Sequence, residues 1–160
     1  MATATLKVEA KGEREIVMIR DFNAPRKLVF DAHTKPDLIK RWLTGPPGWV
    51  MAVCEVDLRV GGKYRYVWRK DKTDTDMGMG GEYREVKAPS RVTCTEVFDQ
   101  AWYEGECVGV LDLVEKNGKT TLTQTLTYSS RAARDGEIQS GKSSGVEHSY
   151  SNLDSLLETL

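Results

Sequence analysis

The stretch at residues 57–66, DLRVGGKYRY, combines residue types that could do chemistry. Asp57 and Arg59 lie two positions apart, so both side chains project from the same face of a strand. We interpret them as a structural ion pair, because acid–base catalysis would need a nucleophile or a metal nearby and none is evident. Gly61 and Gly62 follow, and they predict a tight turn or a bulge.

Three large aromatic side chains then occupy alternate positions, Tyr64, Tyr66 and Trp68, with Arg65 and Val67 between them. This alternation predicts a strand with two different faces. Exposing three rings together would leave a large apolar area in water, so we expect the aromatic face to turn inward. Two interpretations stay open: the rings fill a core, or they line a pocket into which tyrosine hydroxyls point.

A carboxyl group and an amide occupy positions that strand alternation also turns inward. Glu96 lies two residues after Cys94 and two before Phe98. Gln124 likewise lies two residues from apolar residues on either side, at 122 and 126. Buried groups of this kind are costly unless they are paired or hydrated. They either pair with each other or with a tyrosine, or they orient a polar group of a ligand. Glu96 with a tyrosine is also the one acid–base set that we identify for an enzyme.

The histidines and cysteines do not form a recognisable site. His33 and His148 lack zinc-site spacing, and we expect them to face solvent or cap helices, unless His148 reaches the mouth of a cavity. Cys54, Cys94 and Cys107 are odd in number and form no CxxC, which argues against a disulfide framework. Nucleophile-elbow, Walker and dinucleotide motifs are also missing. We therefore predict no metal, no cofactor and no catalytic residue.

Composition narrows the class of protein. The chain has 160 residues, which we expect to form one domain over residues 1–160, with residues 1–13 as a flexible segment. Its 23 basic and 24 acidic residues nearly cancel, so a nucleic-acid partner is not expected. No apolar run approaches the roughly 18 residues that span a bilayer, and the start resembles no secretory signal. We expect a protein of the cytoplasm without membrane insertion.

The pattern of apolar residues predicts a strand, two short helices, six further strands and a long helix. The first strand covers residues 15–22, and prolines at 25 and 36 open the two helices. The later strands are expected near residues 50–58, 63–70, 81–86, 91–98, 105–114 and 120–128. The Asn117-Gly118 pair predicts a tight hairpin between the last two of them.

The end of the chain is predicted to hold a loop and then a helix. Residues 130–144 are polar and rich in glycine and serine, so we expect a loop there. After it, apolar residues recur at the spacing of an amphipathic helix: Val146, Tyr150, Leu153, Leu157 and Leu160. The apolar face of this helix needs a partner, and the concave face of a curved sheet would provide one.

The element order and four stretches, RDFNAPRKLVFDAHTKPDLIKRW, DLRVGGKYRY, GGEYREV and GVEHSYSNLDSLL, resemble the activator-of-heat-shock-protein-90-ATPase-homologue family. The resemblance covers about residues 14–160. It implies the α+β helix-grip fold of the START-like, birch-pollen-allergen-type superfamily: a curved, seven-stranded antiparallel sheet around a long C-terminal helix, with a cavity between them. Leu43 departs from the pattern, since many relatives carry a second tryptophan after Trp42.

The resemblance and the residues together favour binding of a small hydrophobic molecule in this cavity. A co-chaperone that stimulates a heat-shock protein 90 ATPase is an alternative, less favoured because we identify no second module to hold a chaperone partner. A cyclase or hydrolase that uses Glu96 and a tyrosine is another, and a homodimer stays open. The expected cavity residues are Tyr64, Tyr66, Trp68, Cys94, Glu96, Phe98, Gln124 and Tyr150.

Overall fold

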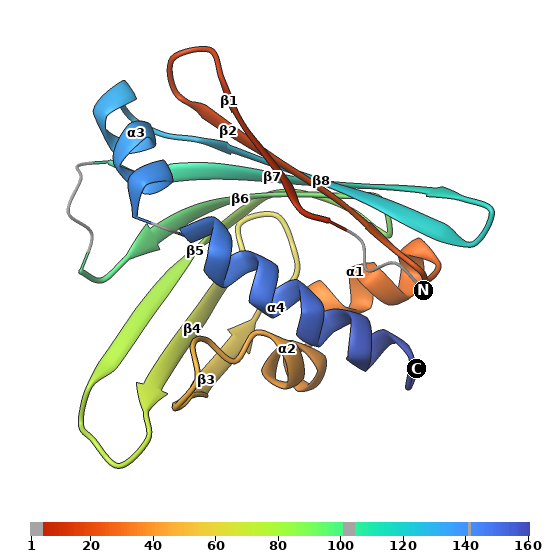
Figure 1. Cartoon of the computed structure of the whole chain (residues 1–160), viewed down its shortest axis with the longest axis horizontal. Helices are drawn as coiled ribbons and strands as arrows, with labels where there is room; N and C mark the ends of the chain where they lie inside the picture. The colour runs from red at the N-terminus through yellow and green to blue at the C-terminus, as the bar shows by residue number, and fades with distance from the viewer. Residues whose placement is uncertain (1–4, 101–104, 141) are drawn as a thin grey trace.

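A computed structural model describes residues 5–100, 105–140 and 142–160, with the side chains of all of these except 142–144. Within these residues the chain forms one sheet of eight strands and four helices (Figure 1). In chain order the elements are β1 (Lys7–Lys11), β2 (Glu15–Phe22), α1 (Arg26–Thr34), α2 (Pro36–Trp42), β3 (Trp49–Val56), β4 (Lys63–Lys70), β5 (Asp76–Lys87), β6 (Arg91–Phe98), β7 (Cys107–Lys116), β8 (Lys119–Thr127), α3 (Arg131–Gln139) and α4 (Lys142–Leu157).

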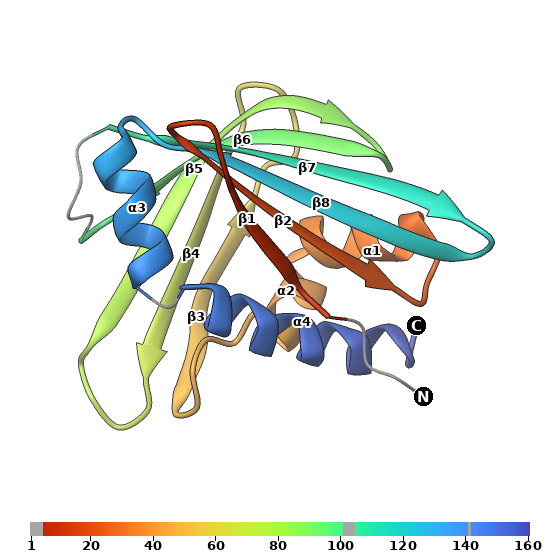
Figure 2. The same cartoon turned by 45° about the horizontal axis from the view of Figure 1, so that its top comes forward.

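The sheet is antiparallel throughout, with the strand order β1-β2-β8-β7-β6-β5-β4-β3. Consecutive strands β2 and β3 therefore lie far apart in the sheet, and α1 and α2 connect them. The sheet curves over α4, and α1 and α2 lie beside that helix on the same side of the sheet (Figures 1 and 2). This arrangement is consistent with a helix-grip fold. No helix in the described residues is long and apolar enough to cross a membrane.

Much of the predicted order is confirmed. β2, β4 and β6 coincide residue for residue with the predicted strands, and Pro25 and Pro36 stand at the starts of α1 and α2. The hairpin between β7 and β8 turns at Asn117 and Gly118, whose φ angles are 54° and 77°. Both residues take the left-handed conformation that a two-residue hairpin requires, which is why this dipeptide was a strong signal.

The prediction of seven strands was wrong, because the sheet has an eighth strand, β1, at one edge. We expected residues 1–13 to be flexible, but Lys7–Lys11 pairs with β2 (residues 1–4 lie outside the described part). Every residue of β1 is exposed. An edge strand of this kind is held by backbone hydrogen bonds and buries no apolar face. The alternation of Val8 and Ala10 with charged residues covers only five residues and is a weak signal.

The predicted loop at residues 130–144 was also wrong, since it contains α3 and the start of α4 (residue 141 is not described). The Ser130 side chain caps α3 by accepting a hydrogen bond from the Ala133 N–H. Arg134 then donates to backbone carbonyls at residues 11, 12 and 15 of the β1–β2 hairpin. This tertiary contact adds to the helix propensity of a segment rich in alanine, arginine, glutamate and glutamine, in which Gly136 is the unfavourable residue.

β5 begins at Asp76, five residues before its predicted start at residue 81. Its first half contains Gly78 and Gly80 and lies between the strands predicted at residues 63–70 and 81–86. Pairing with β4 on one side and β6 on the other holds this half in the sheet regardless of propensity.

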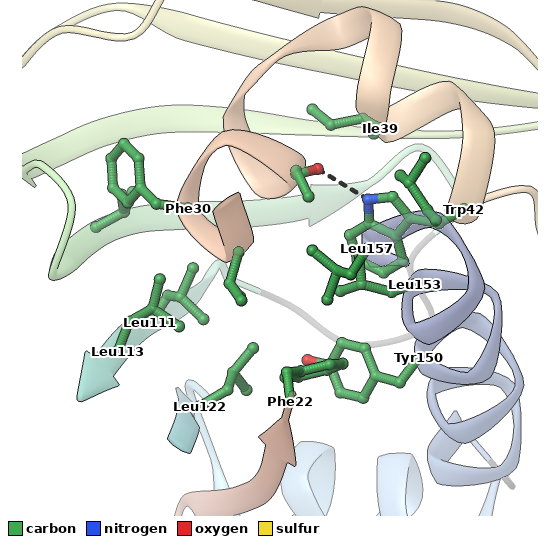
Figure 3. Packing of buried hydrophobic residues seen from close by; sticks show 14 of the residues in the cluster. Phe22, Phe30, Ile39, Trp42, Leu111, Leu113, Leu122, Tyr150, Leu153 and Leu157 are labelled. Atoms are coloured by element: carbon green, nitrogen blue, oxygen red, sulfur yellow. Dashed lines mark hydrogen bonds between the residues drawn. The ribbon is translucent and has the colours of Figure 1, made fainter. Parts of the chain in front are cut away.

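α4 closes the core through one apolar face. Tyr150, Leu153 and Leu157 are buried against Phe22 of β2 and Trp42 of α2 (Figure 3). The Trp42 indole N–H donates to the Ala32 carbonyl at 2.8 Å, which fixes the ring between α1 and α4. Leu160, expected to continue the stripe, lies beyond the helix and is exposed. The helix stripe is otherwise as predicted.

An ion pair between a buried guanidinium and a partly exposed carboxylate adds a polar link between β2 and α4. The Arg20 guanidinium is 1% exposed and donates to both carboxylate oxygens of Asp154, at 2.8 and 2.6 Å. The Cζ atom of Arg20 lies 4.7 Å from the Phe22 ring centroid and 5.9 Å from the Tyr150 ring centroid. Arg20 therefore combines a two-pronged salt bridge with cation–π contacts, at a strand position that alternation reserves for apolar residues.

Asp154→Ala should destabilise the protein by about 2–4 kcal/mol, because it leaves the Arg20 charge buried without its partner. The matched control is Asp57→Ala, which breaks the exposed Asp57–Arg59 pair and should cost under about 1 kcal/mol. Chemical denaturation of both variants measures the difference. Equal losses would show that the Arg20–Asp154 pair does not fix α4 to the sheet.

Candidate functional site

A pocket of about 810 Å³ lies between the concave face of the sheet and the helices α1, α2 and α4. Most of its lining is apolar or aromatic. All eight residues proposed from the sequence line it: Tyr64, Tyr66, Trp68, Cys94, Glu96, Phe98, Gln124 and Tyr150. Their role in binding a ligand remains a prediction.

The three aromatic residues of β4 form one wall of this pocket. Adjacent ring centroids are 5.0 Å apart for Tyr64 and Tyr66, and 6.0 Å apart for Tyr66 and Trp68. Trp68 donates its indole N–H to the Leu43 carbonyl at 2.8 Å, which ties the wall to the end of α2. Arg65, between the rings in sequence, pairs instead with Asp99. The strand thus has the two different faces that its alternation predicted.

The Tyr64 hydroxyl has a structural task. It donates to the Thr95 carbonyl at 2.7 Å, where the regular pairing of β5 with β6 is interrupted between Gly80 and Tyr83. At this interruption a side chain on Gly81 would place its Cβ 1.7 Å from the same carbonyl oxygen, so only glycine fits. Burial raises the pKa of Tyr64, which stays a neutral donor.

The Tyr66 hydroxyl differs, since it has no hydrogen-bond partner among the described residues. Burial raises its pKa well above the usual range, with further contributions from Tyr83, Cys54, Cys94 and Glu96. The group therefore remains protonated at neutral pH. It can donate a hydrogen bond to a molecule in the pocket without breaking a bond within the protein.

A polar niche interrupts the apolar lining at Gly109 of β7. A Cβ on Gly109 would lie 2.7 Å from the Glu96 carboxylate Oε2 and 2.9 Å from the Gln124 amide Nε2. The missing side chain thus makes room for these two polar groups, which come from the flanking strands β6 and β8. We call Gly109, Glu96 and Gln124 the Gly109 niche.

His33 was expected to face solvent or to cap a helix, and its ring is instead partly buried at the last turn of α1. Its Nδ1 lies 2.7 Å from the Val29 carbonyl and so carries the proton, while Nε2 is buried without a partner among the described residues. The ring packs 4.9 Å from Trp42 and 6.4 Å from Tyr150. Burial lowers the pKa of His33 to about 4, so the ring is neutral at pH 7.

Neither a reactive thiol nor a metal cluster is evident in the described part of the chain. Burial raises the pKa of Cys94 to about 12 and that of Cys54 to about 11, which keeps both protonated. No group of three or more histidine, cysteine, aspartate or glutamate side chains could hold a metal ion among the described residues. His148 is exposed and also borders the pocket.

Several lining residues escaped the sequence analysis as site residues. Tyr83, Met77 and Met79 all come from β5, whose glycine-rich start hid its alternation. Trp42 and Ile39 come from the buried face of α2 and were not proposed as site residues. The inward alternation of Met77, Met79 and Tyr83 was a usable signal once the strand was known to begin at residue 76.

A curved sheet that encloses a pocket against a long terminal helix defines a helix-grip domain. Residues 23–158 match the model of the family described as Activator of Hsp90 ATPase homolog 1-like protein. Because this match covers most of the chain, the protein belongs to that family, as the sequence resemblance indicated.

Solved structures agree with this fold. A protein from Rhodobacter sphaeroides is 27% identical with a TM-score of 0.90, covering 98% of this chain and 100% of its own. One from Staphylococcus epidermidis is 27% identical with a TM-score of 0.80, covering 94% and 93%. An AHSA1-like protein from Aeromonas hydrophila shares the fold at 19% identity and a TM-score of 0.72, covering 89% and 93%. A comparison with curated proteins gives no match.

Tyr64→Phe and Tyr66→Phe should differ in stability although the two rings are neighbours. Removing the Tyr64 hydroxyl leaves the buried Thr95 carbonyl without this donor and should cost about 1–3 kcal/mol. Removing the Tyr66 hydroxyl should change the unfolding free energy by under about 1 kcal/mol, since no protein bond is lost. Urea denaturation compares them, and a larger loss in Tyr66→Phe would contradict the assignment.

The stability of the protein should fall between pH 6.5 and pH 4 because of His33. The unfolded chain binds a proton on this ring at about pH 6.5, whereas the folded chain resists it to about pH 4. Within that window the unfolded state holds more protons, so stability present above pH 6.5 declines by up to about 3 kcal/mol.

His33→Asn keeps a nitrogen near the δ position and cannot titrate, so it should lose less stability over the same window. Denaturant melts of both proteins at pH 7.5 and pH 4.5 isolate the contribution of the ring. Identical pH dependence of the two proteins would show that His33 is not the titrating group.

Proposed function

We propose that this protein binds a small hydrophobic or amphipathic molecule in the pocket between the sheet and α4. The pocket itself is the observation that carries the proposal. Well-packed interiors contain few voids larger than a water molecule, so a volume of about 810 Å³ is not a packing defect. It falls within the range of about 300–1,000 Å³ that is usual for small-molecule sites.

The chemistry of the lining supports binding. Aromatic and aliphatic side chains supply most of the surface, which suits a molecule with a large apolar part. A few polar groups converge on the same space: the Tyr66 hydroxyl and the Gly109 niche. This combination orients a ligand through a small number of hydrogen bonds while burial of apolar surface supplies most of the affinity.

The same groups favour binding over catalysis. A tyrosine whose pKa is raised by burial and by the nearby Glu96 is a poor general base at neutral pH. The pocket thiol of Cys94 is likewise held protonated. The cyclase or hydrolase alternative therefore lacks an activated nucleophile among the described lining residues.

The co-chaperone alternative follows from the family description alone. It predicts stimulation of a heat-shock protein 90 ATPase by the purified protein, which a steady-state ATPase assay measures directly. Under the ligand-binding proposal, the ATPase rate should be the same with ligand-bound and ligand-free protein.

Native mass spectrometry of freshly purified protein should reveal a bound small molecule. Cys94→Phe extends a side chain into the pocket and should abolish the added mass. The matched control is Val97→Phe, which adds a ring at an exposed position of the same strand and should leave the added mass unchanged. Thermal melts verify that both variants fold. An added mass that survives in Cys94→Phe would place the bound molecule elsewhere.

A further inference from the structure

The two sides of the pocket differ in composition. Among the described residues, every lining residue of β4 and β5 is aromatic or methionine: Tyr64, Tyr66, Trp68, Met77, Met79 and Tyr83. We call this set the aromatic–methionine wall. The aliphatic lining residues come from other parts of the chain, such as Ile39 of α2, Leu111 of β7 and Leu126 of β8. The pocket therefore offers two different surfaces to a bound molecule.

Rings and methionines face each other across the aromatic–methionine wall. The strand register pairs Trp68 with Met77 and Tyr66 with Met79. Methionine is unbranched and polarisable, so it adjusts to a neighbouring ring and its sulfur makes favourable contacts with ring edges. The tilted and edge-on rings of β4 offer faces and edges for further aromatic packing. A flat aromatic ring suits this wall better than a flexible alkyl chain, which would lose more conformational freedom on binding.

The Tyr66 hydroxyl gives this wall a hydrogen-bond donor for a ligand. The neighbouring Tyr64 hydroxyl is already bound to the Thr95 carbonyl, whereas that of Tyr66 makes no hydrogen bond with the described residues. The His33 Nε2 atom is sealed within the protein, but the Tyr66 oxygen keeps accessible surface and its ring lines the pocket. Burial raises the pKa of Tyr66 well above its usual range, so the phenol stays protonated.

A neutral phenol in apolar surroundings pairs best with an acceptor oxygen, because neither partner then carries a charge that must be desolvated. A carbonyl group attached to an aromatic ring supplies such an oxygen beside the ring plane. Tyr66 lies in the middle of the wall, with its ring centroid 5.0 Å from that of Tyr64 and 6.0 Å from that of Trp68. A ring that packs on the wall therefore brings its carbonyl within reach of this hydroxyl.

We propose that the pocket selects an aromatic ketone, with the ring packed on the aromatic–methionine wall and the Tyr66 hydroxyl donating to the carbonyl oxygen. This inference rests on the proposed ligand-binding function and specifies its ligand class. The remainder of the molecule extends toward the aliphatic side of the pocket, formed in part by Leu111 and Leu126.

Three probes with equal numbers of carbon atoms test the proposal: 2-acetylnaphthalene, 2-ethylnaphthalene and 2-dodecanone. The second lacks the carbonyl, and the third keeps it on an alkyl chain. Equilibrium dialysis at pH 7.5 measures the affinity of each. The aromatic ketone should bind at least about threefold more tightly than the alkyl ketone, although the alkyl chain is the more hydrophobic. An alkyl ketone that binds as tightly or more tightly would overturn the preference for a ring.

Tyr66→Phe tests the hydrogen bond. It should weaken binding of 2-acetylnaphthalene by at least about threefold and change that of 2-ethylnaphthalene by under about twofold, because the hydrocarbon has no acceptor. Tyr128→Phe removes a buried hydroxyl outside the described lining and should leave both affinities unchanged. Melting curves confirm that each variant is folded. A smaller loss for the ketone, an equal loss for the hydrocarbon, or a loss found in Tyr83→Phe instead would overturn the role of Tyr66.

The position of the ring is tested by the methyl signals of methionine in NMR spectra. Met77 and Met79 belong to the wall, Met18 lines the pocket from β2, and Met51 lies outside the described lining. Adding 2-acetylnaphthalene should shift the signals of Met77 and Met79 most, through the ring current of the naphthyl group, and should leave Met51 nearly unchanged. A larger shift at Met18 would place the ring on the other side of the pocket and contradict the proposal.

These outcomes separate the inference from the function on which it rests. If the probes bind without the expected preferences, the ligand class is wrong and ligand binding stands. If no probe binds but native mass spectrometry shows a molecule that Cys94→Phe removes, the inference fails and the proposed function again stands. If no probe binds and no such molecule is found, both fail.

Discussion

The ion pair between Arg20 and Asp154 holds the terminal helix against the first long strand, and the pocket depends on this placement. Arg20 is 1% exposed and donates to both oxygens of the carboxylate. Two parallel hydrogen bonds between a guanidinium and a carboxylate require a specific relative orientation. The pair therefore restricts both the position of α4 along β2 and its distance from the strand. Tyr150, one turn before Asp154, is thereby held against Phe22 and Trp42.

This anchoring allows the rest of the helix to remain separated from the sheet. A domain of this size needs a continuous core, and here Leu153, Leu156 and Leu157 provide it at one end of α4, with α1 and α2. Toward the start of the helix, Val146 lines the pocket, and Tyr150 contacts both this core and the pocket. Concentrating the packing at one end leaves an internal volume open without exposing the apolar face of the helix to solvent.

Neighbouring tyrosines on β4 show how one strand serves both stability and the site. The Tyr64 hydroxyl donates a hydrogen bond to the Thr95 carbonyl, where the pairing of β5 with β6 is interrupted. Tyr66 makes no such bond among the described residues and leaves its hydroxyl for the pocket. Where the pairing of β5 with β6 is interrupted, the backbone of Gly81 also lies close to the Thr95 carbonyl to which Tyr64 donates. The sequence pattern is the same for both tyrosines, and only their neighbours decide which one is structural.

The sequence by itself determined the order of β2, α1, α2, β3 to β8 and the terminal helix, the bounds of three strands and the inward face of β4. It did so because alternation, proline at helix starts and an Asn-Gly turn act locally. It also identified the eight proposed pocket residues as inward-facing through the same alternation and the apolar stripe of the terminal helix. The family resemblance supplied the curved sheet and the cavity, which local patterns do not encode.

Only the tertiary structure decided the remaining features, because each depends on a partner distant in the chain. β1 exists through backbone pairing with β2, and α3 is held by Arg134 at the β1–β2 hairpin. His33 is partly buried because Trp42 of α2 and Tyr150 of α4 pack against its ring, although its helix position alone indicated exposure. The Gly109 niche required β6, β7 and β8 to be side by side, since its two polar groups are 28 residues apart in sequence.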